Sequence, residues 1–190
     1  METSRITGIL LAAGDSSRFG SNKLLQVLPN GYTIGISSAR NLSKEVDDLT
    51  VVVGKKGDLT DTMFKNNGYI TVVAENSKLG MGNSLKSGIT VNSRSLGWVV
   101  ALADMPYITS SIIESLVSEI RNGAKMCAPF YDSVRGHPVG FGNVLREELL
   151  NLDDAFGASD LLQKYRKKVV EIPTEDKGIL HDIDFPSDII

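Results

Sequence analysis

The sequence predicts an α/β fold in which helices cover both faces of a mostly parallel sheet. Short apolar runs alternate with stretches of helical periodicity, and most of these runs are apolar almost throughout. A strand that is covered on both faces is continuously apolar, whereas a half-exposed strand alternates apolar and polar residues. Alternation of strands and helices along a chain is typical of βαβ units and an open sheet.

The apolar runs identify the expected strands, and the amphipathic segments identify the expected helices. Strands are predicted at Ile6–Leu11, Leu49–Val53, Tyr69–Ala74, Trp98–Ala103, Lys125–Pro129 and Val169–Pro173. Helical segments are predicted at Ile34–Lys44, Asp58–Asn66, Asn83–Val91, Ser110–Arg121, Val144–Asn151 and Ala158–Tyr165. The stretch YDSVRGHPVGF, residues 131–141, is expected to be a loop that leads into a further strand.

The clearest helix is the one predicted over residues 110–121. Its apolar stripe consists of Ile112, Ile113, Leu116, Val117 and Ile120. Ser111 and Glu114 have the spacing of a capping box, and Gly123 follows the helix end. The segment at residues 34–44 is less regular, because Gly35 is a weak helix former.

Length and composition indicate one globular domain over residues 1–190, with 42% apolar and 23% charged residues. The net charge of −3 gives no broad basic field, so we expect neither nucleic acid nor a membrane as partner. The single cysteine, Cys127, excludes an intramolecular disulfide and a multi-cysteine zinc site, and its apolar surroundings favour a buried structural role. The apolar run near the N-terminus is too short to span a membrane, and we interpret it as the first core strand of a cytoplasmic protein.

The loop after the first strand is the first candidate site. LAAGDSSRFGSNK contains two glycines and delivers Arg18 and Lys23 to the carboxyl edge of the sheet, where open α/β proteins bind ligands. Backbone N–H groups in such a turn can hold an anion, and the two cations would add to that attraction. The loop has neither the Walker A pattern nor the Gly-x-Gly-x-x-Gly fingerprint. A phosphate cradle and an ordinary strand-to-helix turn both remain open.

Acidic residues follow two other segments. Asp104 follows the apolar residues of VVALADMP and is expected at the same sheet edge. A carboxylate beside a polyphosphate is a natural Mg²⁺ ligand. The alternative is that Asp104 caps the next helix, but Thr109 and Ser110 are better placed for that cap. Asp182 and Asp184 lie two residues apart on an extended segment, and we expect only one of them to face the site. One could complete a metal site with Asp104, or both could belong to a solvated acidic patch.

Two glycine-containing segments complete the candidate list. Gly80 and Gly82 precede a helix whose N-terminus, with Ser84, offers donors to a ligand, or they are simply a cap. RGHPVGF, residues 135–141, holds His137 in a loop between Gly136 and Pro138. A lone histidine is more often structural than catalytic.

Together these stretches resemble the MobA-like NTP transferase family, and most closely its MocA-type branch of molybdenum cofactor cytidylyltransferases. The resemblance is carried by LAAGDSSRFGSNKL, LGMGNSLKSG, LADMP, RGHPVGF and DIDFP, in the family's order and across almost the whole chain. It implies a Rossmann-like three-layer α/β/α nucleotidyltransferase fold. It also implies that a phosphate of molybdopterin attacks the α-phosphorus of CTP, with Mg²⁺ as cofactor and pyrophosphate as leaving group.

The resemblance also implies roles for individual residues. The nucleotide would be bound by Leu11, Ala12, Ala13, Gly14, Arg18, Lys23, Gly80, Gly82, Ser84 and Asp104. Arg18, Lys23 and Asp104 would be catalytic, and the two cations would neutralise the leaving pyrophosphate. Asp104 and Asp184 would hold the metal, with Asp182 as the other candidate for the second position. The acceptor would be bound by Arg135, Gly136, His137 and Pro138.

Three readings of function follow. The preferred one is cytidylyl transfer to molybdopterin, because guanylyltransferases of the family tend to carry Gly-Gly where this chain has Ala12-Ala13-Gly14. The second is a nucleotidyltransferase of the same fold that uses another nucleotide, such as GTP, or another phosphorylated acceptor. The third is a non-catalytic nucleotide- or cofactor-binding protein that delivers its cargo to a molybdenum hydroxylase. The catalytic readings need no general base, since a phosphate nucleophile is already ionised near neutral pH and positioning and electrostatics carry phosphoryl transfer.

Overall fold

One mixed sheet forms the centre of the structure. The structure is a computed structural model, and it describes residues 4–14, 19, 22–75, 77, 80–154 and 157–190. Within these residues the sheet has eight strands in the order β3-β2-β1-β4-β7-β5-β6, and β8 pairs with β5. The strands are β1 (Ile6–Ala12), β2 (Asp48–Val53), β3 (Ile70–Val73), β4 (Gly97–Leu102), β5 (Met126–Tyr131), β6 (Val134–Arg135), β7 (Val139–Gly142) and β8 (Val170–Pro173).

Most strand pairs are parallel, as the sequence predicts. β1 pairs in parallel with β2 and β4, β2 with β3, and β5 with β8. The antiparallel strand β7 lies between β4 and β5, and the short β6 pairs antiparallel with β5. The predicted loop at 131–141 is therefore a turn that carries β6 and then leads into β7, which fills the gap between two parallel groups.

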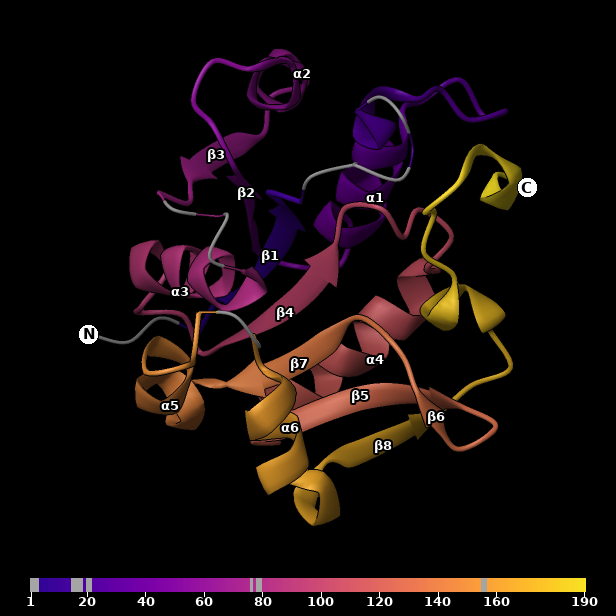
Figure 1. Cartoon of the computed structure of the whole chain (residues 1–190). Coiled ribbons are helices and arrows are strands. Elements are labelled where there is room, and N and C mark those ends of the chain that lie inside the picture. The colour runs from indigo at the N-terminus through magenta and orange to yellow at the C-terminus, as the bar shows by residue number, and fades with distance from the viewer. Residues whose placement is uncertain (1–3, 15–18, 20–21, 76, 78–79, 155–156) are drawn as a thin grey trace.

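Helices cover both faces of this sheet and make a three-layer arrangement (Figure 1). The main hydrophobic core lies under α1 (Ile34–Ser43), α2 (Leu59–Asn66) and α4 (Ser110–Arg121). The opposite core lies under α3 (Met81–Val91), α5 (Arg146–Leu150) and α6 (Ser159–Lys164). Short 3₁₀ turns occur at Lys23–Leu25, Asn143–Leu145, Arg166–Lys168, Lys177–Leu180 and Pro186–Asp188. In the described parts of the chain, no helix combines the length and apolarity needed to cross a membrane.

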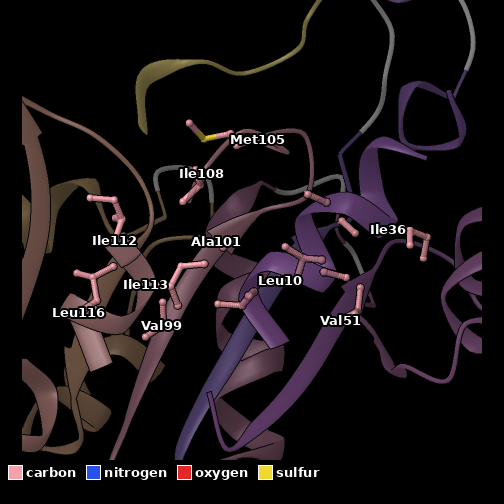
Figure 2. Packing of buried hydrophobic residues seen from close by; sticks show 14 of the residues in the cluster. Leu10, Ile36, Val51, Val99, Ala101, Met105, Ile108, Ile112, Ile113 and Leu116 are labelled. Atoms are coloured by element: carbon pink, nitrogen blue, oxygen red, sulfur yellow. The ribbon is translucent and has the colours of Figure 1, made fainter. Parts of the chain in front are cut away.

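The strands divide their side chains between the two cores with the period of two that a pleated strand imposes. In β1, Leu10 faces the main core while Ile9 faces the opposite one. Figure 2 shows how Leu10 and Val99 from neighbouring strands pack in the main core with Ile113 of α4. The predicted apolar stripe of α4 is buried throughout.

The expectation that every apolar run is covered on both faces is wrong for the outer strands. Ile70 of β3 is 71% exposed, and Val170 of β8 is 37% exposed. Both strands lie at the margins of the sheet, with a neighbouring strand on one side only. Their β-branched residues favour a strand conformation without full burial.

The structure confirms the predicted bounds of α4 but not its capping box, and it explains an irregularity in α1. The N-cap of α4 is Thr109, so the capping box proposed from Ser111 is wrong; the Thr109 hydroxyl donates to Asp176 Oδ2 at 2.9 Å instead. Gly123 ends the helix with a positive φ of 92°, as predicted. In α1, a Cβ on Gly35 would lie 3.0 Å from Phe64 Cζ, so the glycine permits close contact between α1 and α2.

Cys127 is fully buried in β5, as predicted. Burial, together with the nearby charge of Glu119, raises the pKa of the Cys127 thiol to about 12. The thiol is therefore protonated at physiological pH, which fits a packing role rather than a nucleophilic one.

Candidate functional site

A cleft of about 300 Å³ opens at the carboxyl ends of β1 and β4. It is lined by Leu11, Ala12, Ala13, Gly14, Lys23, Leu24, Ser77, Gly80, Met81, Ser84, Leu102, Ala103 and Asp104. Eight of the residues to which the sequence assigns a nucleotide-binding role are in this set. Arg18 lies outside the described residues. The remaining residues of the set were not predicted, although Met81 lies within the motif LGMGNSLKSG and Ser77 precedes it by two residues.

The central position of β1 in the sheet brings these segments together. Leu11 is in register with Val52 of β2 on one side and with Leu102 of β4 on the other. The loop after β1 therefore starts between two other strand ends, where ligands of open α/β sheets bind. No described atom lies within 4 Å of the position where a Cβ of Gly14 would be, so the backbone there is open to a ligand.

A local cap fixes the backbone that carries Lys23. The Asn22 side chain accepts a hydrogen bond from the Leu24 N–H at 3.2 Å and donates to Thr60 Oγ1 at 2.6 Å. This capping starts the 3₁₀ turn at residues 23–25, and burial of Leu24 anchors the turn in the main core. Lys23 is left on the cleft side of the turn.

Helix α1 holds the backbone around Asp104 in place. The Ser38 hydroxyl donates to the Ala103 carbonyl at 2.9 Å, and Asn41 Nδ2 donates to the Pro106 carbonyl at 2.9 Å. The Ala103 N–H also donates to the Leu11 carbonyl at 3.0 Å. Asp104 therefore follows β4 on a backbone that is hydrogen-bonded on both sides.

Lys23 pairs with two carboxylates that are far apart in the sequence. Its Nζ lies 2.8 Å from Asp104 Oδ2 and 3.0 Å from Asp184 Oδ1. The three side chains are only 12%, 24% and 31% exposed, respectively. Burial lowers the pKa of Lys23, but hydrogen bonds and charge from the two aspartates outweigh it, and the pKa is raised on balance. The amine is thus held in its protonated form.

The C-terminal segment brings Asp184, rather than Asp182, next to Asp104. Ile183 is fully buried, and its N–H donates to the Asp104 carbonyl at 3.0 Å. Asp184 faces Lys23 while Asp182 is exposed, although residues two apart on a regular extended segment would point to the same side, so the segment departs from regular alternation here.

Asp188 fixes this segment, and it was not predicted as a site residue. Its Oδ2 accepts hydrogen bonds from the N–H groups of Asp184 at 2.9 Å and Phe185 at 2.7 Å. These two donors lower the pKa of Asp188. The available signal was Pro186 followed two positions later by an acidic residue, the pattern of a helical turn whose third residue caps its own start.

The carboxylate pair fits a divalent cation. Asp104 Oδ1 is buried and has no hydrogen-bond partner within the described residues, so one ligand oxygen is unused. The described part of the chain has no group of three or more histidine, cysteine or acidic side chains that could hold a metal by themselves. Mg²⁺ does not require such a cage, since it binds one or two carboxylates together with phosphate oxygens and water.

Gly80 and Gly82 have different surroundings. Gly80 is the N-cap of α3 with a positive φ of 135°, no side chain caps the helix there, and Gly80, Met81 and Ser84 line the cleft. Gly82 instead packs against the segment before α6. Its N–H donates to the Asp154 carbonyl at 3.0 Å, and a Cβ would lie 2.1 Å from the Asp153 carbonyl oxygen. The structure thus gives Gly82 a packing role.

The segment at 136–138 lies against the C-terminal part of the chain. The His137 N–H donates to the Ile179 carbonyl at 2.9 Å, and the His137–Pro138 peptide bond is cis. Burial lowers the pKa of His137 to about 4, and Arg135 adds to this effect, while Asp104 partly opposes it. The imidazole is neutral at physiological pH, and its buried Nδ1 has no partner within the described residues.

Arg135 lines a second groove rather than the main cleft. This groove, of about 650 Å³, lies between the β5–β6 turn and α6, and it also includes Ser133 and Arg166. Burial lowers the pKa of Arg135. Of the four residues predicted to bind the acceptor, Arg135 therefore lines a separate groove, whereas His137 lies near enough to Asp104 for that charge to affect its pKa.

Residues 8–169 match the model of a family described as the MobA-like NTP transferase domain. The match spans most of the chain, and the chain belongs to this family of nucleotidyltransferases.

Curated relatives are similar over part of their length. The chain is 29% identical over 121 residues to a probable molybdenum cofactor guanylyltransferase from Natranaerobius thermophilus, covering 63% of the chain and 57% of the relative. It is 28% identical over 151 residues to the bifunctional protein GlmU from Aquifex aeolicus, covering 74% of the chain. The chain spans only about a third (32%) of GlmU and little more than half of the guanylyltransferase.

Solved structures have the same fold. The homologue of Mycobacterium tuberculosis Rv0371c from Mycobacterium sp. strain JC1 is 30% identical, with a TM-score of 0.80 and coverage of 97% of this chain and 93% of that one. Rv0371c from M. tuberculosis H37Rv, in a complex with manganese, is 24% identical with a TM-score of 0.79, covering 97% and 95% of the two chains. These matches agree with the α/β nucleotidyltransferase fold that the sequence predicts.

Proposed function

We propose that this protein transfers CMP from CTP to the phosphate of molybdopterin, with Mg²⁺ and with release of pyrophosphate. The observation that carries the proposal is the cluster of Asp104, Lys23 and Asp184 at one end of a cleft formed by the loop after β1 and the N-terminus of α3. Phosphoryl-type transfer depends on positioning and on stabilisation of negative charge, and this cleft offers groups for both.

Each group has a role in the proposed reaction. Backbone N–H groups of residues 11–14, which end β1 and begin the loop after it, and those at the α3 N-terminus that are not bonded within the protein would hold the triphosphate. Lys23, together with Arg18 on the evidence of the motif alone, would neutralise the leaving pyrophosphate. Asp104 and Asp184 would hold Mg²⁺, which supplies charge neutralisation at the phosphates. The manganese complex of the similar Rv0371c supports the proposal that a protein with this fold binds a divalent cation.

The acceptor side requires no strong base. The incoming phosphate is already ionised near neutral pH, so the reaction needs it aligned with the α-phosphorus rather than deprotonated. His137, neutral and with an unused Nδ1, is proposed as a hydrogen-bonding contact to the acceptor. Gly136 and Pro138 would shape that contact, and Arg135 would attract a more distant anionic group from its own groove.

The proposed preference for CTP depends on Ala13, which lines the cleft. The curated relatives named above include a guanylyltransferase, so the family includes proteins with a different nucleotide in their names. A methyl group at position 13 reduces the space beside the nucleotide relative to the glycine that guanylyltransferases tend to carry. We infer that a smaller pyrimidine is favoured.

Pyrophosphate release tests the proposal. The full chain is incubated with each of CTP, GTP, UTP and ATP, with and without Mg²⁺, and with molybdopterin or with a panel of other phosphorylated acceptors. We expect release that requires CTP, Mg²⁺ and molybdopterin together, and Ala13→Gly is expected to raise the relative rate with GTP. Preference for GTP, UTP or ATP would contradict the cytidylyl assignment.

The same assay separates the alternatives. Turnover with another acceptor, at a rate that molybdopterin does not support, would indicate the second reading of the sequence. Nucleotide binding with no turnover under any condition would favour a delivery protein, and co-purification with a molybdenum hydroxylase would then identify its partner.

A further inference from the structure

The ammonium group of Lys23 lies between the same two carboxylates that the proposed function gives to a divalent cation. Nζ contacts Asp104 Oδ2 at 2.8 Å and Asp184 Oδ1 at 3.0 Å, in surroundings where all three side chains are mostly buried. Partial burial strengthens charge interactions, because less water screens them. A divalent ion bound to these two oxygens would therefore meet strong repulsion from the ammonium group.

We propose that Lys23 competes with the metal for the carboxylate pair in the nucleotide-free protein. A bound triphosphate draws Lys23 away, and the metal and the nucleotide therefore bind cooperatively. The proposal rests on the proposed function only in taking Asp104 and Asp184 as the metal ligands. Neither the base nor the acceptor enters the argument.

The arrangement of the three groups supports such an exchange. The carboxylates of Asp104 and Asp184 both lie close to Lys23 Nζ and would repel each other without a cation between them. Lys23 therefore stabilises the pair when no metal is bound. Asp104 Oδ1 has no partner within the described residues, so Lys23 leaves part of that carboxylate unused. Lysine has a flexible four-carbon side chain, and a triphosphate offers it a more highly charged partner nearby.

Energetic coupling has a reciprocal consequence. If nucleotide binding raises the affinity for metal by removing Lys23 from the carboxylates, metal binding must raise the affinity for nucleotide by the same factor. Neutralising Lys23 should abolish most of this coupling, because the carboxylates are then available to metal from the start.

Binding of Mn²⁺ to the nucleotide-free full-length chain tests the inference without any catalytic readout. Free Mn²⁺ is measured by electron paramagnetic resonance during titration of the wild type, Lys23→Gln and Lys56→Gln. Lys56 is an exposed lysine after β2, which β1 separates from β4 and Asp104, so its variant loses the same charge without a contact to the pair. We expect Lys23→Gln to bind Mn²⁺ at least about tenfold more tightly than the wild type, and Lys56→Gln to change little.

A double variant locates the ion. Lys23→Gln combined with Asp104→Asn should lose the tight binding if the ion occupies the carboxylate pair. Equal Mn²⁺ affinity in Lys23→Gln and the wild type would overturn the inference, as would an equal gain in Lys56→Gln or tight binding that survives in the double variant. The proposed function is judged separately by pyrophosphate release, so tight Mn²⁺ binding by Lys23→Gln without turnover in the wild type would leave this inference standing and reject that function.

Discussion

Asp104 connects several parts of the proposed site through its side chain and its backbone. Its carboxylate pairs with Lys23, its backbone carbonyl accepts the N–H of Ile183, and its second oxygen is unused. The residue thereby joins the end of β4 to the 3₁₀ turn that carries Lys23 and to the C-terminal segment. A change in its charge should affect chemistry more than folding.

We expect Asp104→Asn to lower the rate of Mg²⁺-dependent pyrophosphate release by at least about 100-fold, because a neutral amide is a poor ligand for Mg²⁺. The thermal unfolding midpoint should stay close to that of the wild type, since the amide keeps the size of the carboxylate. Asp160→Asn, at an exposed position on α6, is the control and should retain full activity. Wild-type turnover in Asp104→Asn would rule out Asp104 as the metal ligand.

Asp188 contributes to the proposed metal site indirectly, because it positions Asp184. Asp188→Ala removes the acceptor for the N–H groups of Asp184 and Phe185 and should loosen the second carboxylate. We expect a fall in turnover of about tenfold at low Mg²⁺ concentration, with recovery as Mg²⁺ increases, because each lost hydrogen bond is worth roughly 1 kcal/mol. Asp188→Asn keeps one acceptor oxygen, so its turnover should lie between that of the wild type and that of Asp188→Ala. Turnover of Asp188→Ala that does not respond to Mg²⁺ would contradict this role.

At the scale of elements, glycines decide how closely α3 approaches its neighbours. Gly82 touches the Asp153 carbonyl, whereas no described atom lies within 4 Å of the Cβ position of Gly14. Both glycines belong to sequence motifs of the proposed site, but close packing in the described structure requires a glycine only at position 82.

A matched pair of substitutions tests this difference. Gly82→Ala should destabilise the protein by about 1–3 kcal/mol, because the added methyl would overlap a backbone carbonyl oxygen. Gly14→Ala should leave the stability nearly unchanged but weaken nucleotide binding, if the nucleotide approaches the backbone there. Urea unfolding and nucleotide titration provide the two measurements. Loss of stability in Gly14→Ala alone would invalidate the distinction.

Helix α2 is attached to the sheet by a buried carboxylate. Asp61 is 1% exposed and accepts hydrogen bonds from Gly57 N–H at 2.7 Å, Thr71 Oγ1 at 2.6 Å and Lys65 Nζ at 2.7 Å. Burial alone would raise the pKa of Asp61, but these donors outweigh it and lower the pKa to about 2. The carboxylate is therefore more acidic in the folded state than in the unfolded chain.

This shift predicts an acid dependence of stability. The contribution of Asp61 is fully present above the unfolded pKa of about 4 and is lost as the pH falls towards about 2. Asp61→Asn should cost about 1–3 kcal/mol at pH 7 and should lose less further stability between pH 4 and pH 2 than the wild type does. Urea unfolding at several pH values measures both quantities. Parallel pH profiles for the two proteins would contradict the assignment.

At the scale of the whole molecule, one sheet connects the first described strand to the last. β1 and β8 belong to the same sheet through β4, β7 and β5, and the C-terminal segment returns to β4 through Ile183. We infer that residues 1–190 form one domain, because the proposed site itself requires both ends of the chain.

A single domain should unfold in one cooperative transition. Trp98, the only tryptophan, is fully buried in β4 at the centre of the sheet, so its fluorescence reports on the core. We expect the fluorescence and far-ultraviolet circular dichroism curves in urea to coincide. Two separate midpoints would show that the chain contains independently folding parts.

Sequence patterns were sufficient for most of the fold because local preferences and tertiary packing agree there. The continuous apolar runs correspond to β1, β2, β4 and β5, and the helical periodicity corresponds to α1 through α4. They were less informative where an element is short or lies at the edge. β6 has two residues, and β3 is partly exposed although its sequence is mostly apolar.

The candidate site was predicted in part. The motifs identified Lys23, Asp104 and the loop after β1, all of which meet in the cleft. The acidic motif DIDFP limited the second carboxylate to Asp182 or Asp184, but the motif could not choose between them. Which residue turns inward depends on the burial of Ile183 and on its hydrogen bond to Asp104, and these are contacts between distant parts of the chain.

The sequence by itself determined the fold class, the order of most elements and the motifs that lie at the carboxyl edge of the sheet. These features follow from local periodicity and from the residue types that phosphates and metals require. Only the tertiary structure decided that Asp184 joins Asp104, that Lys23 lies between them, and that Gly82 is a packing residue. Each depends on a close approach between segments far apart in the chain, which no local pattern encodes.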